Sequence, residues 1–139
     1  MARLTGKNWY GSFKGISMVA IPFRTFDDGL EEEMADASGG SDTIRTYVHT
    51  MDKVEPSFEW VYDSSAAGTA LVAVLEPGQE GTLLWGPRGT AAGSPKWGIT
   101  GRVVKATPDI KYDDVQVDKV KFMPVDGAYL FDGRTAVWP

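Results

Sequence analysis

The apolar positions of the chain recur mostly at every second residue, which is the period of a β-strand whose two faces differ. The clearest example is the segment 57–62, where Phe58, Trp60 and Tyr62 share one face and Glu59 lies on the other. Similar patterns predict further strands, and Pro22 confines the first of them to a sheet edge or a bend. These strands are expected at residues 15–26, 43–50, 82–85, 97–107, 115–123 and 128–131.

The segment 115–123 contains a change of phase. Val115 and Val117 share one face of the expected strand, whereas Val120 and Phe122 share the other. A slip of one residue moves every following side chain to the opposite face of a sheet. A β-bulge near Asp118 would keep both halves on one core, and we predict one there.

One segment follows the period of a helix instead. Ser and Asp side chains precede it and can cap its first turn, and Pro77-Gly78 ends it. The apolar side chains that share one helical face are Ala67, Ala70, Leu71, Val74 and Leu75. We therefore predict a helix over about residues 64–76 that packs Leu71, Val74 and Leu75 against a sheet. The fold class is mainly β, a β-sandwich or β-barrel of about seven strands with this one flanking α-helix.

Residues 27–42 form a segment with little apolar content, with three glycines and seven carboxylates. We predict a long acidic loop there that is mobile in the monomer, and loops of this length often carry function. Residues 86–95 form a second loop, of small residues. With neither an internal repeat nor a low-complexity linker, we expect a single domain over 1–139 with an N-terminal arm over about 1–14.

Composition narrows the possible classes of protein. The chain has 139 residues, a formal net charge of −5, one His and no Cys, which excludes structural disulfides, Cys-ligated zinc and a thiol nucleophile. It has no apolar run near the roughly 20 residues of a membrane-spanning helix. The N-terminus also lacks the apolar region of a secretory signal. We expect a soluble protein of a reducing cytoplasm, or of a particle assembled there.

Charge is unevenly distributed along the chain. Residues 1–26 carry four basic side chains and no acidic one, whereas residues 27–63 carry eleven acidic and two basic side chains. A nucleic-acid-binding protein needs clustered Lys and Arg to neutralise phosphates, and this chain does not have that pattern. The acidic block is either a solvated loop or a surface that repels anions or meets a basic partner.

Motifs for catalysis or cofactor binding are weak. The glycine-rich segment 86–94 lacks the Lys of a phosphate-binding loop and is followed by Pro95, so we predict a turn between strands. His49 has no accompanying Gly-x-Ser-x-Gly motif and is expected to be a structural or surface residue. The acidic block does not have EF-hand spacing, although an irregular oxygen-lined cation site and a pair of glycosidase carboxylates stay open. We predict no enzymatic activity, no cofactor and no metal or catalytic residue.

The order of these features resembles the tail tube proteins of long-tailed bacteriophages, which are related in fold to the tubes of contractile injection systems. An acidic stretch over 31–38 leads into the strand pattern of 43–48, and residues 56–63 run directly into the single helix. A short strand is then followed by Gly-Pro-x-Gly-Thr-x-x-Gly-x-Pro over 86–95, and residues 108–127 are similar to the family's final strand pair. The resemblance covers about residues 15–130.

The resemblance implies a structural virion protein without catalytic activity or cofactor. Six β-sandwich protomers would close into a ring, and rings would stack into a hollow tail tube that conducts DNA without binding it specifically. The implied partners are other copies of the chain, a tape measure protein, a tail terminator and tail-tip proteins. The implied location is the virion tail, assembled in the host cytoplasm.

In such a tube, the acidic segment and the basic N-terminus are expected to make contacts between rings or subunits. The expected contact residues are Arg3, Lys7, Lys14, Asp27, Asp28, Glu31, Glu32, Glu33 and Asp36. An alternative is a capsid decoration or head–tail connector protein of a phage, which is also β-rich and oligomeric. A third possibility is an acidic β-barrel that binds a small molecule.

Overall fold

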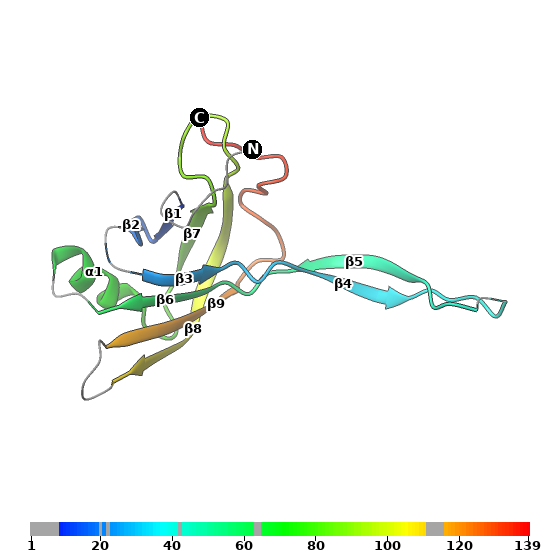
Figure 1. The fold of residues 1–139 in the computed structure, drawn as a ribbon, viewed down its shortest axis with the longest axis horizontal. Coiled ribbons are helices and arrows are strands. Elements are labelled where there is room, and N and C mark those ends of the chain that lie inside the picture. The colour runs from blue at the N-terminus through cyan, green and yellow to red at the C-terminus, as the bar shows by residue number, and fades with distance from the viewer. Residues whose placement is uncertain (1–8, 20, 22, 42, 63–64, 111–115) are drawn as a thin grey trace.

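A computed structural model describes residues 9–19, 21, 23–41, 43–62, 65–110 and 116–139. Within these ranges the chain forms nine strands and one helix (Figure 1). In chain order they are β1 (Tyr10–Phe13), β2 (Ile16–Ser17), β3 (Phe23–Asp27), β4 (Glu31–Asp36), β5 (Tyr47–Lys53), β6 (Ser57–Val61), α1 (Ala66–Val74), β7 (Glu80–Gly86), β8 (Trp97–Asp109) and β9 (Val117–Pro124). The mainly β fold class with a single helix is confirmed.

Seven of the strands form one antiparallel sheet in the order β2-β1-β7-β8-β9-β6-β3, and β4 and β5 form a separate two-stranded hairpin. Among the described residues, β2 and β3 do not pair, so the sheet does not close into a barrel. The sheet bends so strongly that side chains from distant strands on its inner face contact each other. Phe26 on β3 and Trp85 on β7 have ring centroids 5.8 Å apart although three strands separate them in the sheet.

The core fills the inside of this bent sheet. The alternation in β6 places Phe58 and Trp60 inward, where both are fully buried. Phe13 on β1 packs against Phe122 on β9, with ring centroids 5.1 Å apart. Burial of a large apolar side chain contributes about 1.5–3 kcal/mol, so these aromatic residues are a main source of stability.

Helix α1 lies at one end of the sheet (Figure 1). The Ser65 hydroxyl accepts a hydrogen bond from the backbone N–H of Gly68 at 3.3 Å and so caps the first turn. Leu71 and Leu75 are buried in the core, as the helical period predicts. The expected residue Ser64 lies outside the described residues. In the part of the chain that the structure describes, no helix has the length and apolar character needed to cross a membrane.

The β-bulge predicted near Asp118 is not in β9. That strand pairs with β6 without a shift in register, and the shift lies in its other neighbour, β8, between Val103 and Lys105. Because β9 keeps its alternation, Val117 faces away from the side of the sheet that Phe122 occupies. The extra residue of the bulge therefore belongs to β8 and not to β9. In β9, the side chain that faces the core at position 118 is the carboxyl group of Asp118.

Several further segments differ from the sequence-based expectation. Residues 10–13 of the expected N-terminal arm form β1 within the main sheet, and residues 43–46 of the strand expected at 43–50 precede β5 and lie in no strand. Residues 15–26 contain two separate strands, β2 and β3, instead of one. Residues 128–131 form no strand, and Phe131 makes only an isolated bridge to Gly98. The acidic segment 27–42, expected to lack regular structure, contains β4, whose backbone is ordered by pairing with β5 although all six of its residues are exposed. Backbone hydrogen bonds, and not burial of side chains, explain that strand.

Candidate assembly interface

The β4–β5 hairpin projects away from the body of the protein (Figure 1). At its root, Gly29 adopts a φ of 58°, and a Cβ there would lie 2.5 Å from the carbonyl oxygen of Glu55. The carboxylate of Asp27 accepts a hydrogen bond from the N–H of Gly29 at 2.9 Å, and that of Asp28 accepts one from Leu30 at 3.2 Å. Two of the expected contact residues thus shape the turn that directs the hairpin outward.

The expected contact residues of the hairpin are divided between its two faces. Side chains of directly paired residues in an antiparallel ladder lie on the same face. One face carries Glu31, Glu33 and Ala35 of β4 with Val48, Met51 and Lys53 of β5. The other face carries Glu32, Met34 and Asp36 with Tyr47, His49 and Asp52. The three consecutive glutamates therefore do not form a single acidic surface, and each face combines charged and apolar groups.

Large apolar side chains are exposed along the whole hairpin. Met34 and Met51 are 57% and 60% exposed on opposite faces, and Ile44 near the tip is 81% exposed. An isolated two-stranded hairpin is marginally stable in water. Large apolar side chains exposed on both faces of an element that has no core of its own favour its association with another molecule. The hairpin therefore has the properties of an element that packs against another molecule.

His49 lies between two carboxylates on one face of the hairpin. Its Nδ1 is 3.1 Å from Oε1 of Glu32, and its Nε2 is 3.5 Å from Oδ1 of Asp52. The imidazole is half-exposed. Its place is at the surface, in agreement with the polar phase of its strand.

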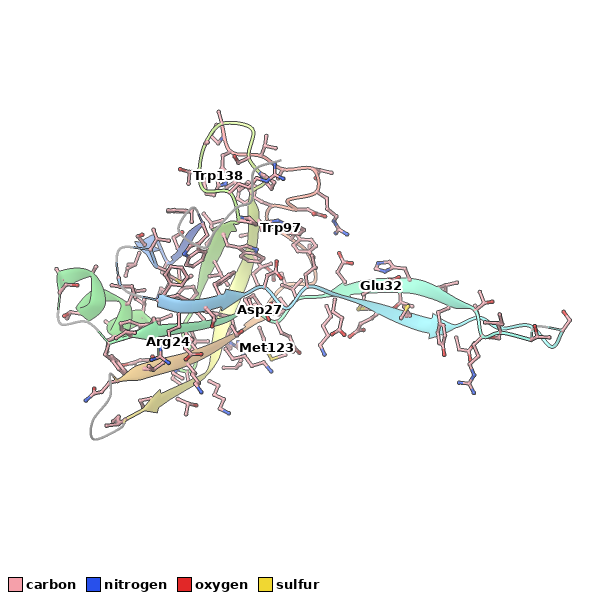
Figure 2. All side chains as sticks on the ribbon, in the orientation of Figure 1. Arg24, Asp27, Glu32, Trp97, Met123 and Trp138 are labelled. Carbon is pink, nitrogen blue, oxygen red and sulfur yellow. The ribbon has the colours of Figure 1, made fainter. Side chains whose placement is uncertain are left out.

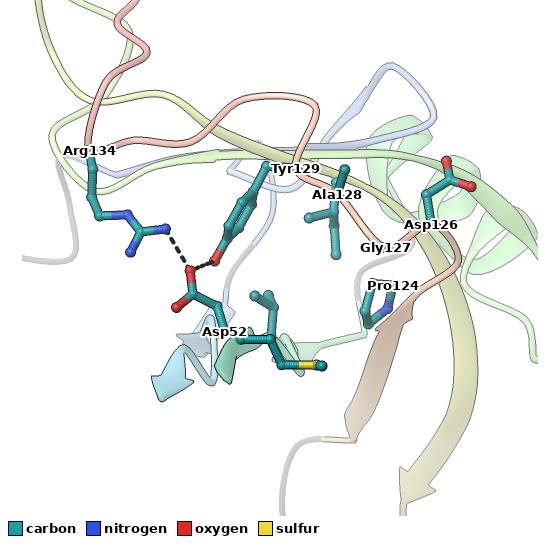
Figure 3. Close-up of a pocket in the computed structure, with 10 residues that line it drawn as sticks. Asp52, Pro124, Asp126, Gly127, Ala128, Tyr129 and Arg134 are labelled. Carbon is teal, nitrogen blue, oxygen red and sulfur yellow. Dashed lines mark hydrogen bonds and ion pairs between the residues drawn. The ribbon is translucent and has the colours of Figure 1, made fainter. Parts of the chain in front are cut away.

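The root of the hairpin is held by an ionic cluster with the C-terminal segment (Figure 3). Asp52, whose side chain is 17% exposed, accepts a hydrogen bond from Tyr129 Oη at 3.3 Å and one from Arg134 Nη2 at 2.6 Å. Arg134 also pairs with Asp132 and holds the pKa of that carboxyl below its usual value. Burial and the adjacent Asp52 raise the pKa of Tyr129 to about 12.

Sequence reasoning did not find this cluster. Asp52 lies 77 residues from Tyr129 and 82 residues from Arg134 along the chain. No local spacing or motif connects an aspartate in one strand with a tyrosine and an arginine in an irregular C-terminal segment. The signal exists only in the tertiary structure.

A hollow of about 460 Å³ opens beside this cluster, between the hairpin root and the body (Figure 3). Its walls come from β5 and the residues that follow it, from β8, and from the end of β9 and the segment after it. They consist of Met51, Asp52, Val54, Ile99, Pro124, Asp126, Gly127, Ala128, Tyr129 and Arg134. Most of this lining is apolar, with charged groups at two ends.

The expected basic counterparts lie elsewhere. Lys14, in the turn after β1, donates a hydrogen bond from Nζ to Oε1 of Gln79 at 2.9 Å. Figure 2 shows Arg24 on the body of the protein and Glu32 on the hairpin, with Asp27 between them. The structure therefore does not bring Lys14 to the hairpin carboxylates of its own chain. Arg3 and Lys7 lie outside the described residues.

The remaining candidate motifs have structural places. The side chain of Ser38, and its backbone N–H at 2.9 Å, donate hydrogen bonds to the carboxylate of Asp36, and both interactions lower the pKa of Asp36. The glycine-rich segment 86–95 is the turn between β7 and β8, as predicted, and the N–H of Gly93 donates to the carbonyl of Trp138. Over the described ranges, no group of three or more His, Asp or Glu residues is placed to hold a metal ion.

The sequence matches no protein-family model and no curated protein. Several solved structures share the fold. The chain aligns with a subunit of the tail of an empty gene transfer agent particle, refined with C6 symmetry, at a TM-score of 0.66 and 9% identity, covering 93% of this chain and 98% of that one. It aligns with the SPP1 tail tube at a TM-score of 0.68 and 8% identity, covering 94% and 80%.

A third similar structure is the sheath–tube complex of the extracellular contractile injection system PVC, in its extended state. Its TM-score is 0.57 at 9% identity, and the alignment covers 93% of this chain and 92% of that one. At such low identity the agreement concerns the fold. It includes nearly the whole chain in all three comparisons, so the bent sheet with its flanking helix is the fold of these tail and injection-system subunits.

Proposed function

We propose that this protein is a structural subunit of a virion tail and assembles with copies of itself into rings that stack as a hollow tail tube. The observation that carries the proposal is the agreement of nearly the entire chain with subunits of a six-fold symmetric tail and of a tail tube. The C6 symmetry of the first supports rings of six protomers. In this role the protein needs no catalytic group and no cofactor.

Self-assembly also agrees with the edges of the sheet. Strands β2 and β3 end the seven-stranded sheet, and each leaves one side without a strand partner among the described residues. Exposed edges are a liability for a small β protein, and contact with a neighbouring protomer removes it. Identical heterologous contacts that repeat around an axis close a ring, and an axial step extends the assembly.

The hairpin is assigned to contacts between subunits or rings. Its apolar side chains contribute nothing to the core that the described residues form, and we assign its carboxylates at 31–33 and 36 to ion pairs with the basic residues Arg3, Lys7 and Lys14 of a neighbour. A stacked tube would need further proteins that set its length and close its ends. We assign these roles to a tape measure protein, a tail terminator and tail-tip proteins, with DNA passing through the lumen.

Electron microscopy of the purified protein in negative stain tests this function. We expect hollow tubes with regular cross-striations, because every protomer presents the same contacts. A capsid decoration protein would instead give closed trimers, and a head–tail connector would give isolated rings. Monomers or closed rings at every concentration would contradict the proposal.

A further inference from the structure

We propose that the tip of the β4–β5 hairpin of one copy docks into the hollow at the hairpin root of a second copy. Ile44 would occupy the apolar part of the hollow, and Arg45 would pair with Asp126 at its rim. The inference rests on the proposed self-assembly. Beyond that self-assembly, it identifies the two surfaces that contact each other.

The hollow has the chemistry of a site for an apolar side chain next to a cation. Val54 and Ile99 form a buried apolar floor. A Cβ placed on Gly127 would meet no atom within 4 Å, so the wall is open there. Figure 3 shows Asp126 at the end of the hollow opposite the pair of Asp52 and Arg134. A volume of about 460 Å³ lies in the range of sites that enclose a bound group.

The charges on the two surfaces are complementary. The carboxylate of Asp52 is paired with Arg134, which it shares with Asp132, whereas Asp126 makes no ion pair with any residue that the structure describes. Arg45 near the hairpin tip is exposed and likewise makes no ion pair within the described ranges. Ile44, beside it, is the most exposed large apolar side chain of the described residues, at 81%. A buried apolar group beside a charge pair at the rim is a typical interface arrangement.

Only another copy can supply this tip. Strand β4 has six residues, and at about 3.3 Å per residue it places the tip about 20 Å from the root of its own hairpin. Figure 1 shows the tip at the far end of the molecule. The donor and acceptor surfaces differ, so the contact is heterologous and continues from copy to copy instead of closing a two-fold dimer.

Docking would also link successive copies mechanically. The walls of the hollow include Met51 and Asp52, which belong to the hairpin of the accepting copy. A tip in the hollow therefore contacts the cluster of Asp52, Tyr129 and Arg134 that holds the next hairpin in place. Each docking event fixes the direction of the hairpin that makes the following one.

A charge exchange tests the pairing of Arg45 with Asp126. We expect Arg45→Glu and Asp126→Arg each to raise the critical concentration for assembly at least tenfold, measured by light scattering and microscopy. The double variant should return it to within about threefold of the unchanged protein. Arg88→Glu, the same charge reversal on an exposed turn away from the hairpin, is the matched control. A double variant no better than the single ones would overturn the proposal.

Disulfide trapping tests proximity directly, because the chain has no cysteine of its own. Ile44→Cys combined with Ala128→Cys should give, after mild oxidation, a ladder of covalent oligomers on a non-reducing gel. The control pair is Ile110→Cys with Ala128→Cys, since Ile110 is also strongly exposed, at 68%, but lies outside the hairpin. Equal cross-linking by the two pairs would overturn the proposal.

The failure of this inference can be separated from the failure of the proposed function. Tubes that form without selective cross-linking would refute the docking and leave the tube function supported. Selective cross-linking without tubes would support the docking and refute the tube. If Ala128→Trp, which fills the hollow, prevents assembly while Ile44→Ser assembles normally, another segment occupies the hollow and the docking of the tip is refuted.

Discussion

At the scale of single residues, the core contains a carboxyl group. Asp118 is 4% exposed, and its Oδ1 has no hydrogen-bond partner among the described residues. It lies opposite Trp60 in the β6–β9 ladder. Burial raises the pKa of Asp118, because the apolar surroundings disfavour the charged form. An ionised Asp118 therefore costs stability.

The destabilisation caused by ionised Asp118 can be measured from the pH dependence of the free energy of unfolding. Because the folded-state pKa lies above the value of about 3.9 for unfolded aspartate, the cost is absent at pH values below both pKa values and grows as the pH rises through them. Asp118→Asn removes the ionisation, so we expect its free energy of unfolding relative to the unchanged protein to increase between about pH 4 and pH 7. Urea titrations followed by tryptophan fluorescence measure it. The exposed change Asp126→Asn is the control, and a difference that does not vary with pH would contradict the expectation.

At the scale of elements, helix α1 owes its stability to packing. Nine residues are too few for an isolated helix to be stable in water, and Gly68 lowers its propensity further. Leu71 is fully buried, whereas Val72 on the same helix is 43% exposed. The two positions therefore separate the contribution of packing from that of helix propensity.

We expect Leu71→Ala to lower the free energy of unfolding by about 2–5 kcal/mol, because it leaves a cavity in the core. Val72→Ala should change it by less than about 1 kcal/mol, since little buried surface is lost there. Chemical denaturation of both variants measures the two values. A loss below about 1 kcal/mol for Leu71→Ala would place that face of the helix in solvent.

The hairpin is the opposite kind of element, since among the described residues no member of the buried core comes from its strands β4 and β5. Replacing residues 33–51 by Asn-Gly keeps the pairs Glu31–Lys53 and Glu32–Asp52 and closes them with a favoured two-residue turn. We expect this variant to unfold at nearly the same temperature and to form no tubes. Calorimetry and electron microscopy measure the two properties. Polymerisation at the rate of the unchanged protein would show that the hairpin is dispensable for assembly.

At the scale of the whole molecule, the net charge bears on the passage of DNA. At −5 per protomer, a ring of six would carry about thirty net negative charges. Each Lys or Arg contact to phosphate adds affinity and would hold back a sliding duplex. The chain should therefore show no measurable binding to duplex DNA at about 150 mM salt in a fluorescence anisotropy titration. Micromolar binding that weakens steeply with salt would indicate a nucleic-acid-binding role instead.

The sequence by itself determined the mainly β class and the single helix, because both depend on local periodicity. Phe58 and Trp60 alternate within five residues of chain, and the cap at Ser65 and the stop at Pro77 lie at the two ends of one segment with helical periodicity. It also marked the segment 27–42 as unusual from its carboxylates and glycines. Each of these signals lies within a short stretch of sequence, so distant parts of the chain are not needed to interpret it.

The tertiary structure decided what depends on distant partners. Residues 31–36 form a strand because their backbone pairs with that of β5, although all six side chains are exposed. The β-bulge lies in β8 and not in β9, since either strand of a pair can supply the extra residue. The cluster of Asp52, Tyr129 and Arg134 joins residues about 80 positions apart, and the hollow beside it exists only where the hairpin meets the body. Such contacts depend on which distant segments the fold brings together, and no local sequence pattern specifies that.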